Sequence, residues 1–158
     1  MNAFISMVKH PVKFRLFLLS KIPSAFFAGV RIKSITEDKC VVIVPYKWFS
    51  TNPFKSTYFA CLAMAAEMST GALALAHIYK RKPSVSMLIV DMSAEYYKKA
   101  TNITTFVCKD GIAIRDAVEE AIAANGTNSI SIKSTGTNEA GELVAEFSFT
   151  WSFKVRSK

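Results

Sequence analysis

Glu67 lies fifteen positions after Asn52, in a stretch of the chain that is otherwise apolar. Residues 59–66 carry no charge, and no cation stands three or four positions from Glu67 on either side. Burial without a counter-ion raises the pKa of a carboxyl group toward the range of a useful base. We therefore predict that Glu67 acts in chemistry. The alternative is a structural carboxylate, bonded to the backbone or to a cation of a partner subunit.

The chain length limits the number of domains, and the cysteines indicate the redox environment of the protein. With 158 residues, 51% of them apolar, residues 1–158 are predicted to form one domain, with residues 1–27 as an N-terminal helical extension. The cysteines are far apart in apolar stretches, which is typical of reduced thiols in a cytoplasmic protein: Cys40, Cys61 and Cys108. Only two histidines accompany them, so we expect no metal site.

A net charge of +8 indicates either an anionic partner or a basic surface that is simply solvated. The basic residues are scattered, with small clusters at 80–82, 98–99 and 154–158. No arginine-rich helix and no glycine-aromatic RNA-binding signature accompanies them, so we expect no nucleic-acid partner. A polyphosphate-bearing ligand and a merely solvated surface remain as alternatives.

One apolar run, residues 59–76, has the length of a short transmembrane segment. Polar residues occupy its centre, and much of the remainder is alanine, so a buried helix without a membrane span is predicted. Residues 9–21 read as an amphipathic helix that packs on the core, with binding to a membrane surface as the alternative.

Periodicity places the elements along the chain. The pattern predicts a helix at 9–21, strands at 29–36 and 39–46, a long helix from about 56 to 80, strands at 85–97 and 102–109, a short helix at 111–124, and strands at 129–134 and 143–155. The long helix is apolar nearly all round and rich in small residues. This order indicates an α+β fold, a curved antiparallel sheet around one central helix.

Three stretches carry a family resemblance. They are the spacing from Asn52 to Glu67, the segment Asp-Met-Ser-Ala-Glu-Tyr-Tyr-Lys-Lys-Ala (residues 91–100) and the turn Gly-Glu-Leu-Val-Ala (residues 141–145). In this order they resemble the hotdog-fold thioesterase-like superfamily, in which a sheet wraps a long helix. Asn-Pro-Phe-Lys-Ser-Thr-Tyr-Phe-Ala, with the helices at 9–21 and 111–124, is similar to a bacterial branch of unknown function.

The resemblance implies hydrolysis of an acyl thioester carried by coenzyme A or by acyl-carrier protein. No cofactor is implied, since coenzyme A enters only as part of the substrate. Glu67 would act as the base or nucleophile, and Asn52 would orient the attacking water or the carbonyl. Asn52 followed by Pro53 is equally a good start for the long helix. An open sheet edge that pairing would cover implies a homodimer or a dimer of dimers.

Many members carry His-Gly-Gly at the helix start, where the matching positions here are Tyr58, Phe59 and Ala60. Amides at a helix start can stabilise an oxyanion, and Ser56 and Tyr58 are further donors near it, although capping and core packing explain both as well. The change from His-Gly-Gly leaves an alternative function, a non-catalytic acyl- or lipid-binding hotdog module.

Three basic residues are candidates for binding the phosphates of coenzyme A, although solvated side chains are the commoner explanation: Lys98, Lys99 and Arg81.

Overall fold

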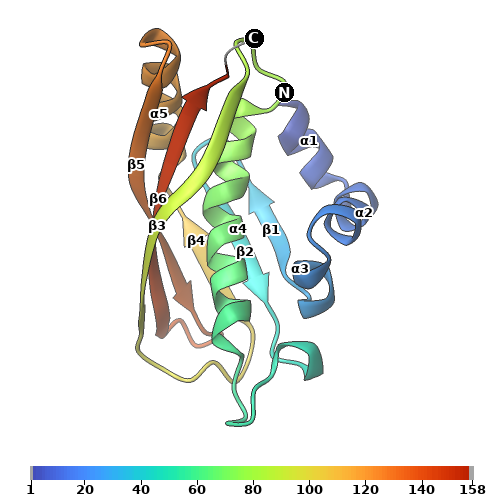
Figure 1. Cartoon of the computed structure of the whole chain (residues 1–158). Helices are drawn as coiled ribbons and strands as arrows, with labels where there is room; N and C mark the ends of the chain where they lie inside the picture. Colours follow the sequence, from blue (N-terminus) through green and yellow to red (C-terminus); the bar gives the residue numbers. More distant parts are fainter. Residues whose placement is uncertain (1, 157–158) are drawn as a thin grey trace.

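A six-stranded antiparallel sheet curves around one long helix, α4 (Phe59–Ile78) (Figure 1). The computed structural model describes residues 2–156. The strand order across the sheet is β1-β2-β4-β5-β6-β3, which leaves β1 and β3 at its two edges. The strands are β1 (Arg31–Ile35), β2 (Cys40–Val44), β3 (Val85–Tyr96), β4 (Thr104–Cys108), β5 (Thr127–Thr137) and β6 (Leu143–Val155). The predicted α+β architecture, a curved sheet around a central helix, is confirmed.

Helix α4 fits inside the sheet because its side chains are small. Alanine, glycine, serine and threonine let the sheet approach closely, and most of the helix is buried. Its polar side chains bond across that contact. The Ser69 hydroxyl lies 2.7 Å from that of Ser134 on β5, and Trp151 Nε1 on β6 donates to Thr70 Oγ1 over 3.0 Å. These bonds satisfy groups that would otherwise be costly to bury.

Strand β6 contributes a row of aromatic side chains to the core, as the alternation of apolar and polar residues along it predicts. Phe147, Phe149, Trp151 and Phe153 are all buried on the side that faces α4. The apolar strand β2 is internal, paired with β1 on one side and with β4 on the other. Helix α5 (Gly111–Ala123) packs against β5 at one end of the sheet.

Three short helices cover α4 on the side away from β5 and β6 (Figure 1). They are α1 (Ala3–Lys9), α2 (Pro11–Lys21) and α3 (Pro23–Ala28), followed later by the 3₁₀ turn η1 (Trp48–Ser50). The sequence predicted a helical extension over residues 1–27 but located only one helix in it, at 9–21, which corresponds to α2. Pro23 begins a further helix, α3, since proline suits the first position of a helix, where no N–H partner is needed.

Candidate functional site

Glu67 lies at the middle of α4 and faces a narrow apolar cavity of about 70 Å³. Phenylalanines of α1 and α2 form one wall, and Met87 of β3 forms part of another. No residue that the structure describes donates a hydrogen bond or forms an ion pair with the carboxylate, and burial alone raises the pKa of Glu67 to about 7. A carboxyl group with this pKa exchanges a proton at neutral pH, as a general base must.

The carboxylate of Glu67 folds back over Gly71, one turn further along α4. A methyl group built on Gly71 would stand 2.7 Å from Glu67 Oε1 and 3.3 Å from Cζ2 of Trp151. Glycine at this position therefore makes room for the carboxylate between the helix and β6. Gly71 was not a predicted site residue, although its place one turn after Glu67 is visible in the sequence.

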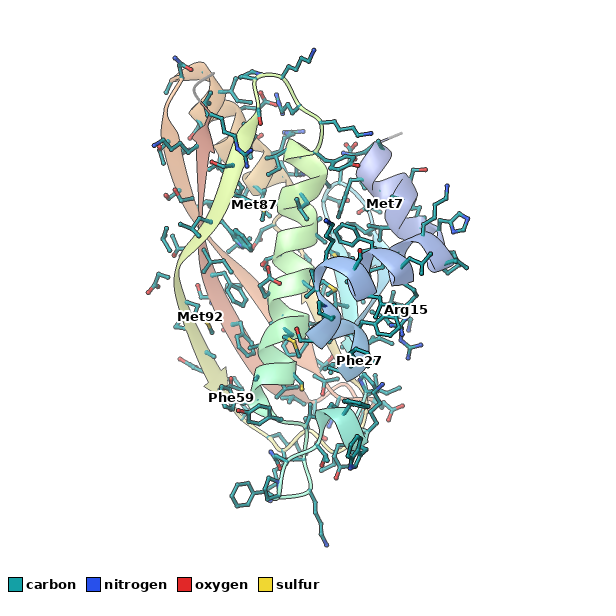
Figure 2. The ribbon with its side chains drawn as sticks, turned by 45° about the vertical axis from the view of Figure 1, so that its right-hand side comes forward. Met7, Arg15, Phe27, Phe59, Met87 and Met92 are labelled. Atoms are coloured by element: carbon teal, nitrogen blue, oxygen red, sulfur yellow. The ribbon has the colours of Figure 1, made fainter. Side chains whose placement is uncertain are left out.

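A second, larger cavity of about 500 Å³ lies at the start of α4. It brings together six predicted site residues from two segments: Asn52, Ser56, Tyr58 and Phe59 from the loop and helix start, and Lys98 and Lys99 from the segment after β3. Thr57 N–H donates to Ala100 O over 2.7 Å and holds the loop against that segment, and Tyr58 N–H donates to Ser50 O over 2.7 Å, which closes the loop on η1. The rings of Tyr58 and Phe59 at the helix start are both exposed, and Figure 2 shows Phe59 at this end of α4.

The amides at this helix start are free to act as donors. The next two amides, those of Cys61 and Leu62, both donate to Tyr58 O, and no side chain caps the helix. Within residues 2–156, the N–H groups of Phe59 and Ala60 donate to no protein group. Unpaired amides at the positive end of a helix are suitable donors for an oxyanion.

Asn52 does not begin the long helix. That helix starts at Phe59 rather than near Ser56, and the interpretation of Asn52 and Pro53 as its first residues is wrong. The Asn52 side chain instead stabilises the turn formed by residues 52–56. Its Oδ1 accepts from the N–H of Phe54 over 2.9 Å, and its Nδ2 donates to Ser56 Oγ over 3.1 Å. The amide thus shapes the rim of the larger cavity, and buried Ser56 serves as its partner.

One polar side chain in this cavity was missed from the sequence. Thr57 lines it and is buried, and its hydroxyl has no hydrogen-bond partner in the part of the chain that the structure describes. Buried hydroxyls are normally paired, so an unpaired one in a cavity is available to a ligand. A threonine before a helix reads as an ordinary capping residue, and only the structure shows that its hydroxyl makes no such bond.

The three basic candidates differ in their surroundings. Arg81 is held by Glu119, with Nη2 2.5 and 2.6 Å from the two carboxylate oxygens, and it lies at the far end of α4 from the cavity. Lys98 pairs with Glu142 over 2.6 Å. Lys99 is exposed on the rim of the cavity and forms no ion pair with a described residue. Of the three, Lys99 is the freest to meet a phosphate.

The structure does not bring Glu67 and the start of α4 together within one chain. Glu67 lies eight positions after Phe59 in the helix, which corresponds to about 12 Å along the axis. Glu67 lines the small cavity, and Asn52 lines the large one. Both cavities reach β3, through Met87 and Tyr96 respectively.

The comparisons with known proteins agree with this architecture. The model of the family DUF4442, a domain of unknown function, matches residues 12–153. The chain belongs to the DUF4442 family. No curated protein matches the sequence.

Solved structures show that this DUF4442 protein has the hotdog fold of thioesterase-like proteins. A protein of unknown function from Pseudomonas aeruginosa, described as a probable thioesterase, is 22% identical with a TM-score of 0.78, over 92% of this chain and 97% of that one. A protein of unknown function from Chlorobaculum tepidum is 15% identical with a TM-score of 0.80, over 98% and 100%. A thioesterase from Haemophilus influenzae is 14% identical with a TM-score of 0.59, over 87% and 85%.

Proposed function

We propose that this protein hydrolyses an acyl thioester of coenzyme A or of an acyl carrier, with Glu67 as general base or nucleophile. The observation that carries the proposal is the Glu67 carboxyl group, which is partly buried among apolar side chains that raise its pKa to about 7. As a base it would take a proton from water as the water attacks the thioester carbonyl. The C–S bond would then break, and Glu67 would return the proton to the departing thiolate. As a nucleophile, Glu67 would attack the carbonyl itself and expel the thiolate, which takes a proton from water, and a second water would hydrolyse the resulting anhydride.

The start of α4 would supply the other half of the site. The free amides of Phe59 and Ala60 suit the oxyanion, and the Thr57 hydroxyl suits the substrate carbonyl or the attacking water. Asn52 would contribute by holding the loop, because its side chain is already bonded to Ser56. The cavity of about 500 Å³ is large enough for part of a thioester substrate.

We further propose a homodimer paired along β3. This twelve-residue strand is at a sheet edge and exposes three large apolar side chains: Leu88, Val90 and Met92. A two-fold axis across β3 would reverse the direction of the partner's α4. Glu67 of one subunit could then meet the helix start of the other, which its own chain holds about 12 Å away.

The test is thiol release from short-, medium- and long-chain and aromatic acyl-CoAs by wild type and Glu67→Gln. The proposal expects turnover that falls at least about a hundredfold in the variant, the size typical of losing a general base. Turnover that survives the substitution would show that Glu67 is not the base.

The second candidate is a non-catalytic acyl- or lipid-binding module. Exposed Tyr58 and Phe59 favour it, since they stand where many hotdog enzymes carry His-Gly. Wild type that retains bound acyl species after purification and turns over no substrate would establish this function instead.

A further inference from the structure

The positive charge of this protein is concentrated in its first 66 residues. They hold nine Lys and Arg against two acidic residues, a net charge of +7 out of the total of +8. The remaining 92 residues carry eleven basic and ten acidic side chains, a net charge of +1. The first acidic residue in the chain is Glu37. Such asymmetry is typical of a surface that binds an anionic partner.

Helix α2 is apolar on two sides, and only one of them is covered. Phe14 and Leu18 are buried against the core. On the opposite side Val12, Leu16 and Leu19 are exposed, and their spacing of four and three places them on one face. We call these three side chains the apolar stripe, and Ile22, just after the helix, instead lines the Glu67 cavity. The lysines of this helical region are Lys9 at the end of α1 and Lys13 and Lys21 of α2, and Lys13 lies about 90° around the helix from the stripe.

An exposed aromatic cluster (Phe27, Trp48 and Phe49) is connected to α2 through Phe26 and Arg15. The rings of Phe27 and Phe49 stack with their centres 5.6 Å apart, and those of Trp48 and Phe49 meet at 4.9 Å. Arg15 of α2 lies 4.0 Å from the centre of the Phe26 ring, which in turn contacts Phe27. Arg15 and Phe27 lie on the outer side of the N-terminal helices in Figure 2.

A basic cavity of about 570 Å³ opens beside the stripe, between the α1–α2 corner and the edge strand β1. Four cations line it together with apolar side chains: Lys9, Arg15, Arg31 and Lys33. No carboxylate lines it, and none of the four forms an ion pair with a described residue. The Nη1 atom of Arg15 is buried without a hydrogen-bond partner in the part of the chain described. An anionic group would supply that partner.

We propose that this face, made of the apolar stripe, the aromatic cluster and the basic cavity, binds the surface of an anionic lipid bilayer. Apolar and aromatic side chains would enter the headgroup region, flanking lysines would meet the negative surface, and the cavity would hold an anionic headgroup. The binding is interfacial, because α4, the one helix within residues 2–156 that is long and apolar enough to span a bilayer, is mostly buried as the core helix. None of the residues of this face lines the large cavity at the start of α4, although Phe14 lines both the basic cavity and the Glu67 cavity, and neither proposal requires the other.

Tryptophan fluorescence tests the proposal without any enzyme assay. Of the two tryptophans, Trp48 is 82% exposed and Trp151 is 4% exposed, so Trp48 reports contact with lipid. Vesicles of about 70% phosphatidylcholine and 30% phosphatidylglycerol should shift the emission to shorter wavelength, and pure phosphatidylcholine should do so weakly. Added salt should weaken the binding, since it screens surface charge. Trp48→Phe should lose the shift while vesicle flotation still shows binding.

Matched variants distinguish binding through this face from nonspecific binding of the protein to vesicles. Leu19→Glu should weaken flotation with anionic vesicles about tenfold, while Ile112→Glu on α5 should not, although the two side chains are 42% and 45% exposed. Lys13→Glu with Lys21→Glu should weaken binding at least about tenfold, and Lys109→Glu with Lys154→Glu, which changes the net charge equally, should weaken it less.

Three results would overturn the proposal. One is failure of the wild-type protein to bind anionic vesicles. Another is equal loss of binding in the stripe variants and their matched controls. The third is conversion of the oligomer to a smaller species by Leu19→Glu without lipid, because the stripe would then be an interface between copies of the chain.

Discussion

The carboxylate of Glu67 occupies the space that a side chain at Gly71 would fill. A methyl group on residue 71 would stand 2.7 Å from Glu67 Oε1, closer than carbon and oxygen approach without a bond. The glycine therefore determines where the carboxylate lies, although it has no chemistry of its own.

Gly71→Ala should displace the Glu67 carboxylate and leave the fold intact. Alanine favours a helix over glycine by about 1 kcal/mol, which offsets the crowding of a flexible side chain. We expect a lower pKa for Glu67, as the carboxylate moves toward water, together with lower thioester turnover. A carbon-13 NMR titration of the carboxyl group measures the first effect. Gly126→Ala is the control, because its added methyl group meets only ordinary contacts.

Glu67 should make folding stability depend on pH. Burial raises its pKa from 4.5 to about 7, so the folded chain binds this proton more tightly than the unfolded chain. The stability from this group is fully present below a pH of about 4.5 and is lost as the pH rises through about 7. The loss is about 3 kcal/mol, at about 1.4 kcal/mol per pH unit.

Glu67→Gln should remove this dependence. Urea denaturation from a pH of about 5 to about 8 should show the free energy of unfolding of the variant rising relative to wild type as the pH increases. If the difference between the two proteins stays constant over that range, Glu67 does not titrate there. In an active enzyme, kcat/KM should rise with pH through about 7, since the base must first lose its proton.

Thr57→Val should lower turnover by about tenfold, the effect expected from one neutral hydrogen bond to the substrate. It should cost little stability, because the hydroxyl has no partner within residues 2–156 and valine keeps the shape. Thr104→Val removes another buried, unpaired hydroxyl from β4, outside the cavity, and should leave turnover unchanged. Equal activity in both variants would mean that Thr57 does not touch the substrate.

Lys99→Ala should raise KM for an acyl-CoA by about fivefold at low salt, as one lost contact to a phosphate predicts. Arg81→Ala should change KM little, because Glu119 already binds the guanidinium and the pair lies away from the cavity. Steady-state kinetics at two salt concentrations compares them. Similar effects from both variants would point to a general influence of net charge.

Leu88→Lys should convert a dimer into monomers, because it places a charge in the middle of the apolar edge of β3. Multi-angle light scattering measures the mass, and Ile112→Lys on α5 controls for the loss of an exposed apolar side chain. If the site is shared between subunits, turnover should fall together with dimerisation. A monomeric wild type would contradict the proposed pairing.

The sequence by itself determined most of the fold. Period-two alternation placed the aromatic side of β6 toward the core, and the small, uncharged residues of α4 indicated a helix inside the sheet. These signals are local and regular, so they survive without knowledge of contacts. The rise in the pKa of Glu67 also followed from the sequence, because an apolar helix leaves a carboxylate no partner among its neighbours.

Only the tertiary structure decided how the site is arranged. Asn52 reads as a helix start, but its amide bonds to Ser56 four residues later, and the helix begins only at Phe59. The ion pairs of Arg81 and Lys98 and the unpaired hydroxyl of Thr57 depend on partners far away in the chain, or on their absence within residues 2–156. Such contacts are made by the folded chain as a whole, and no spacing along the sequence encodes them.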